Sequence, residues 1–530
     1  MLLIPLIALV ATLVMPAAKK NWIKQVALLS TLLQAGLVFG LILPAFLSAT
    51  PDFMDFRLIE QMQWIRLDLG DSGILNIEFH LALDGISMSM LTLTTLILPI
   101  AIYKSFGVEK RVKAYFALIL LLDLAMLGSF MALDFFLFYL FYEFMLLPMF
   151  FLIGLWGGPR REYAAIKFFL YTLFGSVFML LIMVGLAFSF TDPALTAELG
   201  SPVYTFDMLH MMPSMDGQFP NMVSDSLFAS GTQLMGMDAR SLAFLVLVIG
   251  FAIKVPSVPF HTWLPDAHVE ASTPISVILA AVLLKIGGYG IIRICYGLFP
   301  EAATEYHFIV ALLGMVSILY GALVAMSQKD LKSLIAYSSI SHMGFVLLGL
   351  ASLNAAGWNG AILQMFNHGI SSAALFLVAG VLYDRTHDRS ILNYSGLWGK
   401  MPRFTVVVLI SFFASMGLPG LNGFVSEMLV FLGAFKATAA GMPVWIPVLS
   451  VLGIVFAAVY FLRTFKQMFF GEFVYNGTGD AANLTDLTTK EIVIMAPLVA
   501  GMIVLGIFPN LVLQIMDSAA SAYTHIFANF

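Results

Sequence analysis

The sequence predicts an all-α polytopic membrane protein with about fourteen transmembrane helices. Of its 530 residues, 60% are hydrophobic and only 11% are charged, whereas a soluble domain carries about 25% charged residues. The apolar residues are gathered into runs of about 20, the length that a helix needs to cross a bilayer. The single cysteine, Cys295, allows neither an internal disulfide framework nor a cysteine-ligated cluster.

The apolar runs extend from the N-terminus to the last part of the chain. In the first run, MLLIPLIALVATLVMPAAKK, the positive charges follow the apolar residues, whereas in a secretory signal peptide they precede them. We therefore interpret this run as the first spanning helix. The predicted helices cover residues 2–18, 25–47, 84–104, 113–132, 134–154, 164–190, 241–260, 274–297, 306–326, 331–352, 359–383, 404–433, 443–468 and 492–515.

The basic residues predict the orientation, because the cytoplasmic loops of membrane proteins carry an excess of lysine and arginine. If the N-terminus lies outside, most of the lysines and arginines fall in loops that are then cytoplasmic. The opposite loops carry only Arg57, Arg66, Arg240, Arg293 and Lys436. We therefore expect both termini on the outer side of the membrane.

Two of the predicted outer loops are long. Residues 48–83 alternate apolar and polar residues around Gly70 and Gly73, a pattern that predicts a β-hairpin. Residues 191–240 are rich in Met, Ser, Gly and Asp and are expected to be irregular. Neither loop shows a catalytic motif.

Two of the predicted helices are interrupted. The seventh contains Pro256 and Pro259, and proline removes a backbone donor and breaks a helix. The twelfth contains GLPGLNG, residues 417–423. Helices 4–8 and 9–13 then form two inverted five-helix repeats, each with its broken helix in fourth place, a layout typical of transporters whose site lies at the breaks. The expected parts of the chain are an N-terminal part (1–112, with helices 1–3), a first repeat (113–303, with outer loop 191–240), a second repeat (304–470) and a cytoplasmic loop with helix 14 (471–530).

Two opposite charges in predicted helices stand out. Glu143 lies in FYLFYEFMLLPMFF, and Lys254 lies just before the break in FAIKVPSVPFHTWLPDAH. Charged residues within the membrane are costly and usually functional. Burial disfavours a charged lysine and a neighbouring carboxylate favours it, so such a pair can gain and lose a proton. The alternatives are a structural ion pair or protonated glutamate for Glu143 and a lysine that extends to the interface for Lys254.

Further titratable residues follow in the later helices. Lys285 lies in AAVLLKIGGYG, His342 in SHMGFVLLGL and His368 in FNHGISSAALF. Glu427 follows the second break in NGFVSEMLVF, and we expect it in the first turn of a half-helix, where the dipole favours an anion. These residues predict a relay that ends at Glu427. The alternatives are hydrogen-bonded core histidines and an ion pair between Glu427 and Lys436.

Motifs for bound cofactors are missing from the sequence. It contains no HExxH, CxxC, P-loop or GxGxxG, so we expect no site for a nucleotide, haem, iron–sulfur cluster, flavin or metal. His261, Asp266 and His268 flank or lie in WLPDAH, and we interpret them as residues that order a short loop.

Three segments carry a resemblance to a known family. KVPSVPFHTWLPDAHVEASTPISVILAAVLLKIGGYG, SLIAYSSISHMGF and NHGISSAALF resemble the antiporter-like proton-pumping subunits of respiratory complex I and the related large subunits of Mrp-type sodium/proton antiporters. The resemblance extends from about residue 80 to about residue 515. Within the family, the acidic Glu427 and the short C-terminal part resemble the subunit M branch, whose counterpart is mitochondrial NADH dehydrogenase subunit 4, because subunits L and N have lysine at this position.

The resemblance implies a function and partners. It implies a non-redox, proton-translocating subunit of NADH–quinone oxidoreductase in the bacterial inner membrane, next to subunits L and N and lipid, with no nucleic acid partner. NADH, FMN, iron–sulfur clusters and quinone are then expected in partner subunits. It assigns a proton relay to Glu143, Lys254, Lys285, His342, His368 and Glu427. An Mrp-type antiporter subunit and a purely structural scaffold are the alternatives.

Overall fold

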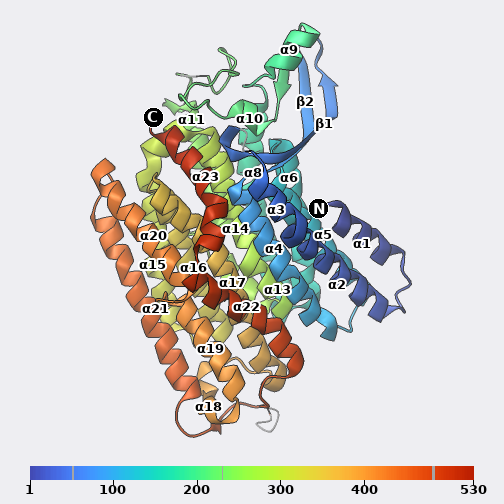
Figure 1. The fold of residues 1–530 in the computed structure, drawn as a ribbon, viewed down its shortest axis with the longest axis vertical. Coiled ribbons are helices and arrows are strands. Elements are labelled where there is room, and N and C mark those ends of the chain that lie inside the picture. The colour runs from blue at the N-terminus through green and yellow to red at the C-terminus, as the bar shows by residue number, and fades with distance from the viewer. Residues whose placement is uncertain (51–52, 230, 480–483) are drawn as a thin grey trace.

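The computed structural model describes residues 1–50, 53–229, 231–479 and 484–530, and it is mainly helical (Figure 1). In the first half, the helices are α1 (Leu3–Val14), α2 (Lys20–Leu37), α3 (Leu43–Ser48), α4 (Gly85–Lys104), α5 (Val112–Met131), α6 (Phe135–Phe144), α7 (Leu146–Trp156), α8 (Arg161–Ala187), α9 (Pro193–Leu199), α10 (Met208–Met211), α11 (Ala239–Lys254) and α12 (Trp263–Glu270). In the second half, they are α13 (Thr273–Ile278), α14 (Leu284–Gly290), α15 (Pro300–Ser327), α16 (Leu331–Leu350), α17 (Ala355–Thr386), α18 (Leu397–Lys400), α19 (Pro402–Ser415), α20 (Asn422–Ala437), α21 (Trp445–Phe469), α22 (Thr489–Ile507) and α23 (Asn510–Phe527).

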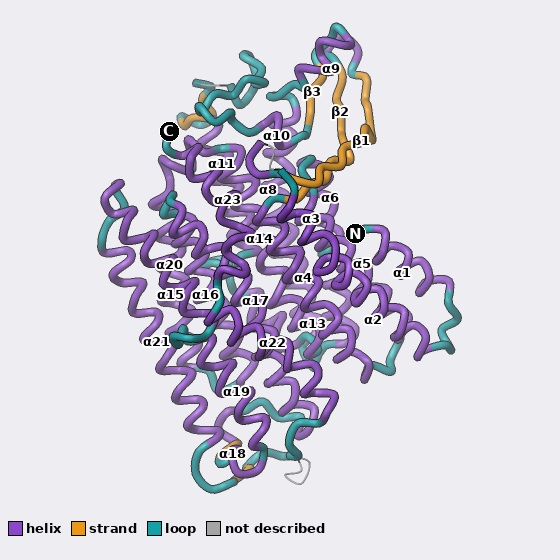
Figure 2. The backbone as a smooth tube through the Cα atoms, in the orientation of Figure 1, coloured by secondary structure: helices purple, strands orange, loops and turns teal. Residues whose placement is uncertain are grey.

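The strands make up a small part of the molecule (Figure 2). They are β1 (Arg57–Asp68), β2 (Ile74–Leu83), β3 (Val203–Thr205), β4 (Gln233–Leu234), β5 (Met237–Asp238), β6 (Tyr394–Ser395) and β7 (Val474–Tyr475). β1 and β2 pair antiparallel, which confirms the predicted hairpin. β3 extends this sheet by pairing parallel to β2, so residues 191–240 contain more regular structure than expected; a three-residue strand is too short to give a sequence pattern.

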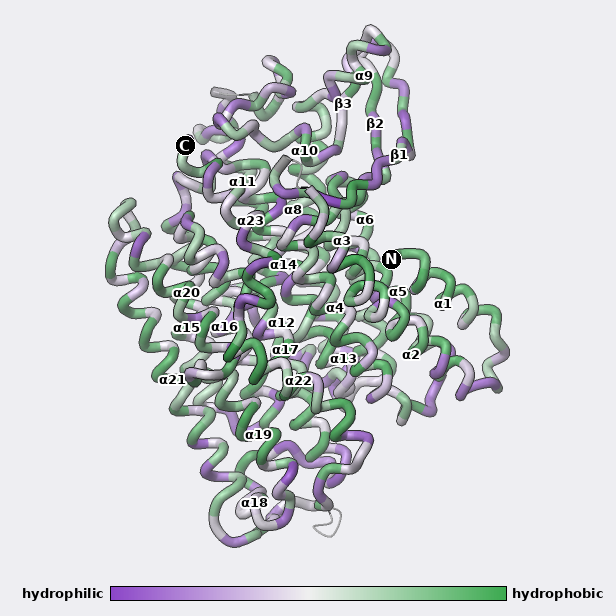
Figure 3. The backbone as a smooth tube through the Cα atoms, in the orientation of Figure 1, coloured by the Kyte–Doolittle hydropathy of each residue, from purple (hydrophilic) through white to green (hydrophobic). Residues whose placement is uncertain are grey.

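The helices confirm the predicted membrane fold. Within the described residues, twelve helical segments are long and apolar enough to cross a membrane, and α1 and α19 are shorter apolar helices. α11 has 16 residues because it ends at the break after Lys254. Figure 3 shows hydrophobic residues along the long helices and hydrophilic residues concentrated at the two ends of the molecule. The total of fourteen spans and the repeats stay predictions.

The end of the chain differs from the prediction. The last predicted helix covered residues 492–515, but α22 ends at Ile507 and a separate helix, α23, begins at Asn510. Pro509 lies between them, and a helix tends to end before a proline. α23 packs against α4 and α17.

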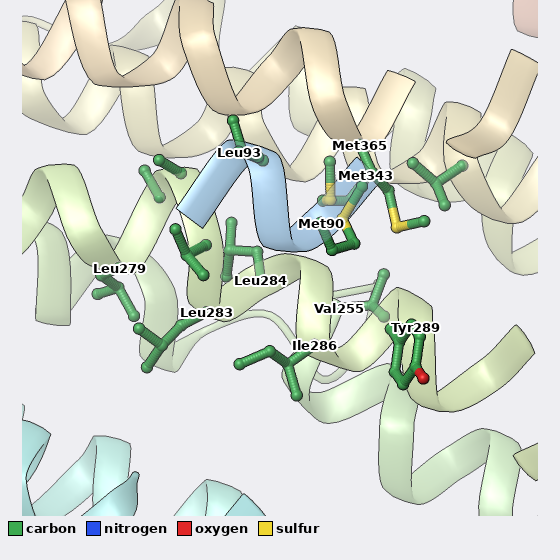
Figure 4. Packing of buried hydrophobic residues seen from close by; sticks show 14 of the residues in the cluster. Met90, Leu93, Val255, Leu279, Leu283, Leu284, Ile286, Tyr289, Met343 and Met365 are labelled. Atoms are coloured by element: carbon green, nitrogen blue, oxygen red, sulfur yellow. The ribbon is translucent and has the colours of Figure 1, made fainter. Parts of the chain in front are cut away.

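The centre of the molecule is built by α4, the segment from α13 to α14, and α17, which are buried along almost their whole length. Figure 4 shows Leu284 beside α4, which carries Met90 and Leu93, and Met365 of α17 near Met90. Charged groups in this region are therefore surrounded by close-packed apolar side chains. Such side chains cannot replace the hydration that a charged group loses when it is buried.

The two ends of the molecule carry different structures. The hairpin lies at one end, where Met1 lines a cavity with Phe79 and where the rings of Phe530 and Phe219 lie 6.4 Å apart. Figure 1 shows the C-terminus near this end and the N-terminus below the hairpin, beside α3 and α5. The opposite end is held together by ion pairs between neighbouring helices and the loop that contains Glu109. They are Lys24–Glu109 at 2.7 Å, Lys104–Asp384 at 2.6 Å and Arg385–Glu491 at 2.9 Å.

Candidate functional site

Lys254 lies at the last position of α11, where the helix is interrupted. Pro256 has no backbone N–H, the next helix begins only at Trp263, and the indole N–H of Trp263 donates to the carbonyl of Ile253 at 2.7 Å. The Lys254 side chain is 2% exposed, and its Nζ makes no hydrogen bond with any described residue. The helix break that the prolines predicted is therefore present, and the buried ammonium group of Lys254 lies next to it.

The main neighbour of the Lys254 ammonium is the ring of Tyr142. Nζ lies 3.8 Å from the ring centroid. A cation–π contact contributes about 2 kcal/mol when it is desolvated, whereas burying an ammonium group costs several kcal/mol. The aromatic contact alone therefore cannot compensate the charge, and a carboxylate is needed nearby.

Glu143 supplies that carboxylate next to a one-residue irregularity at Met145, which keeps helical φ and ψ and which the sequence analysis missed. α6 ends at Phe144 and α7 begins at Leu146. Pro148 lacks the N–H that in an unbroken helix would bond to the carbonyl of Phe144, and this proline was the signal for the irregularity. Glu143 is half-buried, and its Oε1 is buried without a hydrogen-bond partner.

Glu143 and Lys254 lie near each other but form no ion pair within 4.0 Å. Their charges act on each other, but although both side chains are described, no ion pair within 4.0 Å joins them. The two residues that the sequence analysis paired therefore lie in one neighbourhood without forming an ion pair.

Lys285 lies at the start of α14, in a helical segment that is buried along its whole length. The segment Leu279–Leu283 is a π-helix, and the N–H of Leu284 bonds to the carbonyl of Leu279 instead of that of Ala280. Lys285 Nζ donates to the Ala280 carbonyl at 2.6 Å and lies 2.8 Å from Nδ1 of His368. A π-helical turn often marks a functional site, and here it presents a carbonyl to a fully buried lysine.

His368 and His342 connect Lys285 to Glu427. The two imidazole rings have centroids 5.4 Å apart, and His342 Nδ1 lies 3.7 Å from Oε1 of Glu427. Gln364 lies beside them, with its Nε2 at 3.3 Å from His342 Nδ1. Ser426 donates to the Gln364 oxygen at 2.6 Å, which fixes this amide. Four titratable side chains thus form a continuous buried series.

Two details of this series differ from the sequence prediction. His368 lies between Lys285 and His342, whereas chain order placed His342 first. α20 begins at Asn422, so Glu427 is in the second turn of the half-helix rather than in the first. The helix dipole therefore has little influence on the Glu427 carboxylate, because its effect falls off within the first turn. The side chains packed around Glu427 have the larger electrostatic influence.

No described contact joins Lys254 to Lys285, so the six predicted residues form two groups. The connection between the groups is a backbone contact, since a Cβ atom at Gly287 would lie 2.8 Å from the backbone nitrogen of Val255. Apolar side chains, including Val255 and Ile286, surround this region (Figure 4). A proton can cross this gap only if water enters or the helices move.

Replacing Gly287 by alanine is expected to destabilise the protein by about 1–3 kcal/mol, because the added methyl group meets the backbone at the broken helix. Thermal unfolding of the purified chain in detergent measures the effect. Gly36→Ala is the matched control, since a Cβ atom at Gly36 of α2 meets nothing within 4 Å. Equal unfolding temperatures for the two variants would contradict the close packing at Gly287.

His268 and Lys332 are buried residues that the sequence analysis did not assign to the site. His268 was expected in a loop, but it lies in α12, is fully buried and stacks on Phe376 with ring centroids 4.4 Å apart. Neither of its ring nitrogens bonds to a described residue. Lys332 Nζ donates to the Ala271 carbonyl at 2.7 Å. Lys332 and Lys285 both lie near enough for their charges to act on His268.

The other residues of the WLPDAH region have structural contacts. Asp266 pairs with Lys167 at 2.7 Å, as expected for a residue that orders its segment. The His261 ring lies 5.0 Å from the ring of Tyr320. A further buried carboxylate, Asp123 of α5, accepts a hydrogen bond from Gln34 at 2.7 Å and contacts none of the relay residues.

Comparisons with known proteins agree with this architecture. Residues 132–457 match the family described as NADH:quinone oxidoreductase/Mrp antiporter, TM. The chain is 41% identical to NADH-quinone oxidoreductase subunit M of Rhodobacter capsulatus, over 97% of this chain and 92% of that protein. It is 36% identical to NAD(P)H-quinone oxidoreductase chain 4 2 of Thermosynechococcus vestitus, over 98% of this chain and 90% of that protein.

Solved structures show the same fold. A chain of respiratory complex I from Thermus thermophilus with bound NADH superposes with a TM-score of 0.78 at 30% identity, covering 99% of this chain and 98% of that one. A chain of the Mrp complex from Dietzia sp. DQ12-45-1b superposes with a TM-score of 0.77 at 21% identity, covering 100% and 98%, which shows the fold alone. The chain therefore belongs to the family of NADH:quinone oxidoreductase and Mrp antiporter transmembrane subunits.

Proposed function

We propose that this chain is a proton-translocating membrane subunit of NADH–quinone oxidoreductase. The observation that carries the proposal is the series Lys285–His368–His342–Glu427, in which each residue contacts the next within the buried centre of the molecule. Titratable residues inside a membrane protein mark ion pathways and proton relays. The names and identities of the relatives support the choice of oxidoreductase.

The proposed path begins at the end that carries the basic loops. Lys332 and His268 receive protons there and pass them to Lys285, and His368 and His342 conduct them to Glu427. Histidine can bind and release protons near neutral pH, so two adjacent imidazoles suit this role. Glu427 releases the proton toward the hairpin end, which we assign to the outer, periplasmic side.

Glu143 and Lys254 act in this proposal as the switch of the path. A buried ammonium group is strongly destabilised when its carboxylate partner moves away. Opening the pair therefore favours loss of a proton by Lys254, and closing it favours uptake. The apolar gap around Gly287 must hydrate for that proton to reach Lys285, which couples hydration to the state of the pair.

The switch residue lies near an edge of the molecule that a partner could reach. Phe144 and Leu147 beside Glu143 are 48% and 54% exposed. We infer that a neighbouring membrane subunit covers this edge and changes the position of Glu143. Antiporter-like subunits L and N are the proposed neighbours.

The proposal places the redox chemistry in other chains. NADH, FMN, iron–sulfur clusters and quinone belong to partner subunits, and this chain contributes translocation without a redox centre of its own. The two predicted repeats, 113–303 and 304–470, contain the switch with Lys285 and the remaining relay residues, respectively. The location is the bacterial inner membrane, with both termini on the periplasmic side.

Purification of the chain with its partners tests the assignment. We expect flavin and iron to co-purify with the tagged chain, and the preparation to reduce quinone with NADH. Because Mrp-type subunits share the fold, sodium-dependent proton exchange is measured in the same membranes without NADH. Sodium/proton exchange by a preparation that lacks flavin and iron would contradict the proposal.

A further inference from the structure

Three potential metal ligands meet at the hairpin end, outside the spanning segments. Glu78 and His80 are two positions apart on β2, so their side chains point to the same face of the strand. Asp207 caps the N-terminus of α10, and its Oδ1 accepts the N–H of Leu209 at 2.9 Å. One ligand atom from each of the three side chains lies within 4.8 Å of the others. Figure 1 shows how β2 and α10 come together from distant parts of the chain.

His80 is the unusual member of this cluster. It is 1% exposed, and neither of its ring nitrogens makes a hydrogen bond with a described residue. Its Nδ1 lies 3.2 Å from Oδ2 of Asp207. Leaving a buried polar nitrogen without a partner costs about 1–3 kcal/mol, so a ligand that engages this ring would stabilise the folded protein.

The surroundings of His80 favour a positive charge. Asp134 is buried next to the cluster, where its Oδ2 accepts the N–H of Glu78 at 3.0 Å. Among the described residues, no lysine or arginine lies within 4.0 Å of the carboxylates of Glu78, Asp134 or Asp207. Two histidines, His80 and His210, are the basic side chains within 4.0 Å of Asp207 among the described residues. Buried charges are usually paired or coordinate a metal ion.

The two carboxylates are already oriented by their neighbours. Asn76 Nδ2 donates to Glu78 Oε1 at 2.9 Å, and Gln61 Nε2 donates to Oε2. Carboxylates that bind metals are usually held by such hydrogen bonds, which fix their direction. Each oxygen keeps a second lone pair for a ligand.

We propose that Glu78, His80 and Asp207 bind one divalent transition metal ion of the zinc type. Zinc accepts imidazole and carboxylate ligands, whereas calcium and magnesium prefer oxygen ligands alone. The ligand atoms of a tetrahedral zinc site, bonded at about 2.0–2.1 Å, lie about 3.3 Å apart, so the three side chains close slightly on binding. Water takes the fourth position. The ion clamps the hairpin to residues 191–240 above the start of α6, a role that does not depend on the proposed proton path.

Metal content of the purified complex that contains the full chain tests this site. The complex is treated with a chelator, supplied with zinc chloride and dialysed, and its zinc is measured by mass spectrometry. We expect the unmodified complex and the control His307→Gln to retain one equivalent of zinc more than His80→Gln and Asp207→Asn. His307 of α15 makes its own contact to the Thr304 carbonyl at 2.7 Å. Equal zinc in all four samples would overturn the proposal.

Cobalt gives a second measurement that does not need a variant to fold. Loading the unmodified complex with cobalt(II) should produce the visible absorption of a tetrahedral site with nitrogen and oxygen ligands, and zinc but not calcium should remove it. A complex without this absorption would overturn the site. A band that calcium displaces as readily as zinc would also overturn it, because it would indicate an oxygen-only site.

Discussion

Glu143→Gln is expected to stop proton-coupled turnover while the complex still assembles. Glutamine keeps the size and hydrogen-bonding capacity of the side chain but cannot carry the charge that Lys254 needs. A positioned proton-transfer group contributes roughly 10²–10⁴-fold to its step, so coupled NADH oxidation should fall by about tenfold or more. The rate in membrane vesicles and the proton gradient that they build, followed with a pH-sensitive dye, measure the effect.

Asp123→Asn is the matched control for this variant. Asp123 is also a buried carboxylate in a spanning helix, but it bonds to Gln34 and contacts no relay residue. Asparagine can keep a hydrogen bond with Gln34, so we expect near-normal turnover. Normal turnover of Glu143→Gln, or an equal loss in both variants, would remove Glu143 from the switch.

Lys285→Met is expected to have an effect of similar size, for a different reason. Methionine has the shape of the lysine stem without an ammonium group, so packing in the buried segment is retained. The contact of 2.8 Å with His368 is lost, and with it the donor that supplies the histidines. Coupled NADH oxidation should fall by about tenfold or more, with unchanged amounts of assembled complex on native gels.

Lys24→Met separates this effect from the general cost of removing a buried lysine. Lys24 is 5% exposed and pairs with Glu109 near the N-terminus of α2, remote from the relay. Losing that pair should reduce stability slightly and leave turnover near normal. If Lys285→Met also turned over normally, protons would have to bypass the centre of the molecule.

The breaks and the hairpin were predictable because proline and glycine act locally. Pro256 and Pro259 interrupt α11 through their own missing donors, and Gly70 and Gly73 mark the turn between β1 and β2. Pro148 gave an equally local signal for the end of α6, which was overlooked. The separation of α22 from α23 at Pro509 is a further case in which a local signal was present in the sequence.

The order and grouping of the relay residues could not be predicted, because they depend on how helices far apart in the sequence pack. The sequence identified Lys285, His342 and His368 as polar residues in apolar helices, but only the packing of α14 against α17 places His368 next to Lys285. The π-helix before Lys285 arises within an apolar run that has no distinctive residue. His268 was assigned to a loop since α12 is only 8 residues long and follows two prolines.

The two groups of relay residues are held by different kinds of backbone segment. Lys254 lies beside the break after α11 and Glu143 beside the irregularity at the end of α6, whereas Lys285 lies in α14 and the histidines lie in the unbroken helices α16 and α17. Movement of the short broken segments can change the first pair without disturbing the buried series. Coupling between the groups is then carried by Gly287 and by water, which makes this contact the place where translocation can be controlled.

The most direct test of the central claim is the number of protons moved per NADH oxidised by the purified complex in proteoliposomes. For Lys285→Met, the account predicts either arrested turnover or fewer protons per NADH than in the unmodified complex, while Lys24→Met keeps the unmodified ratio. An unchanged ratio at unchanged turnover in Lys285→Met would contradict a proton path through Lys285, His368, His342 and Glu427.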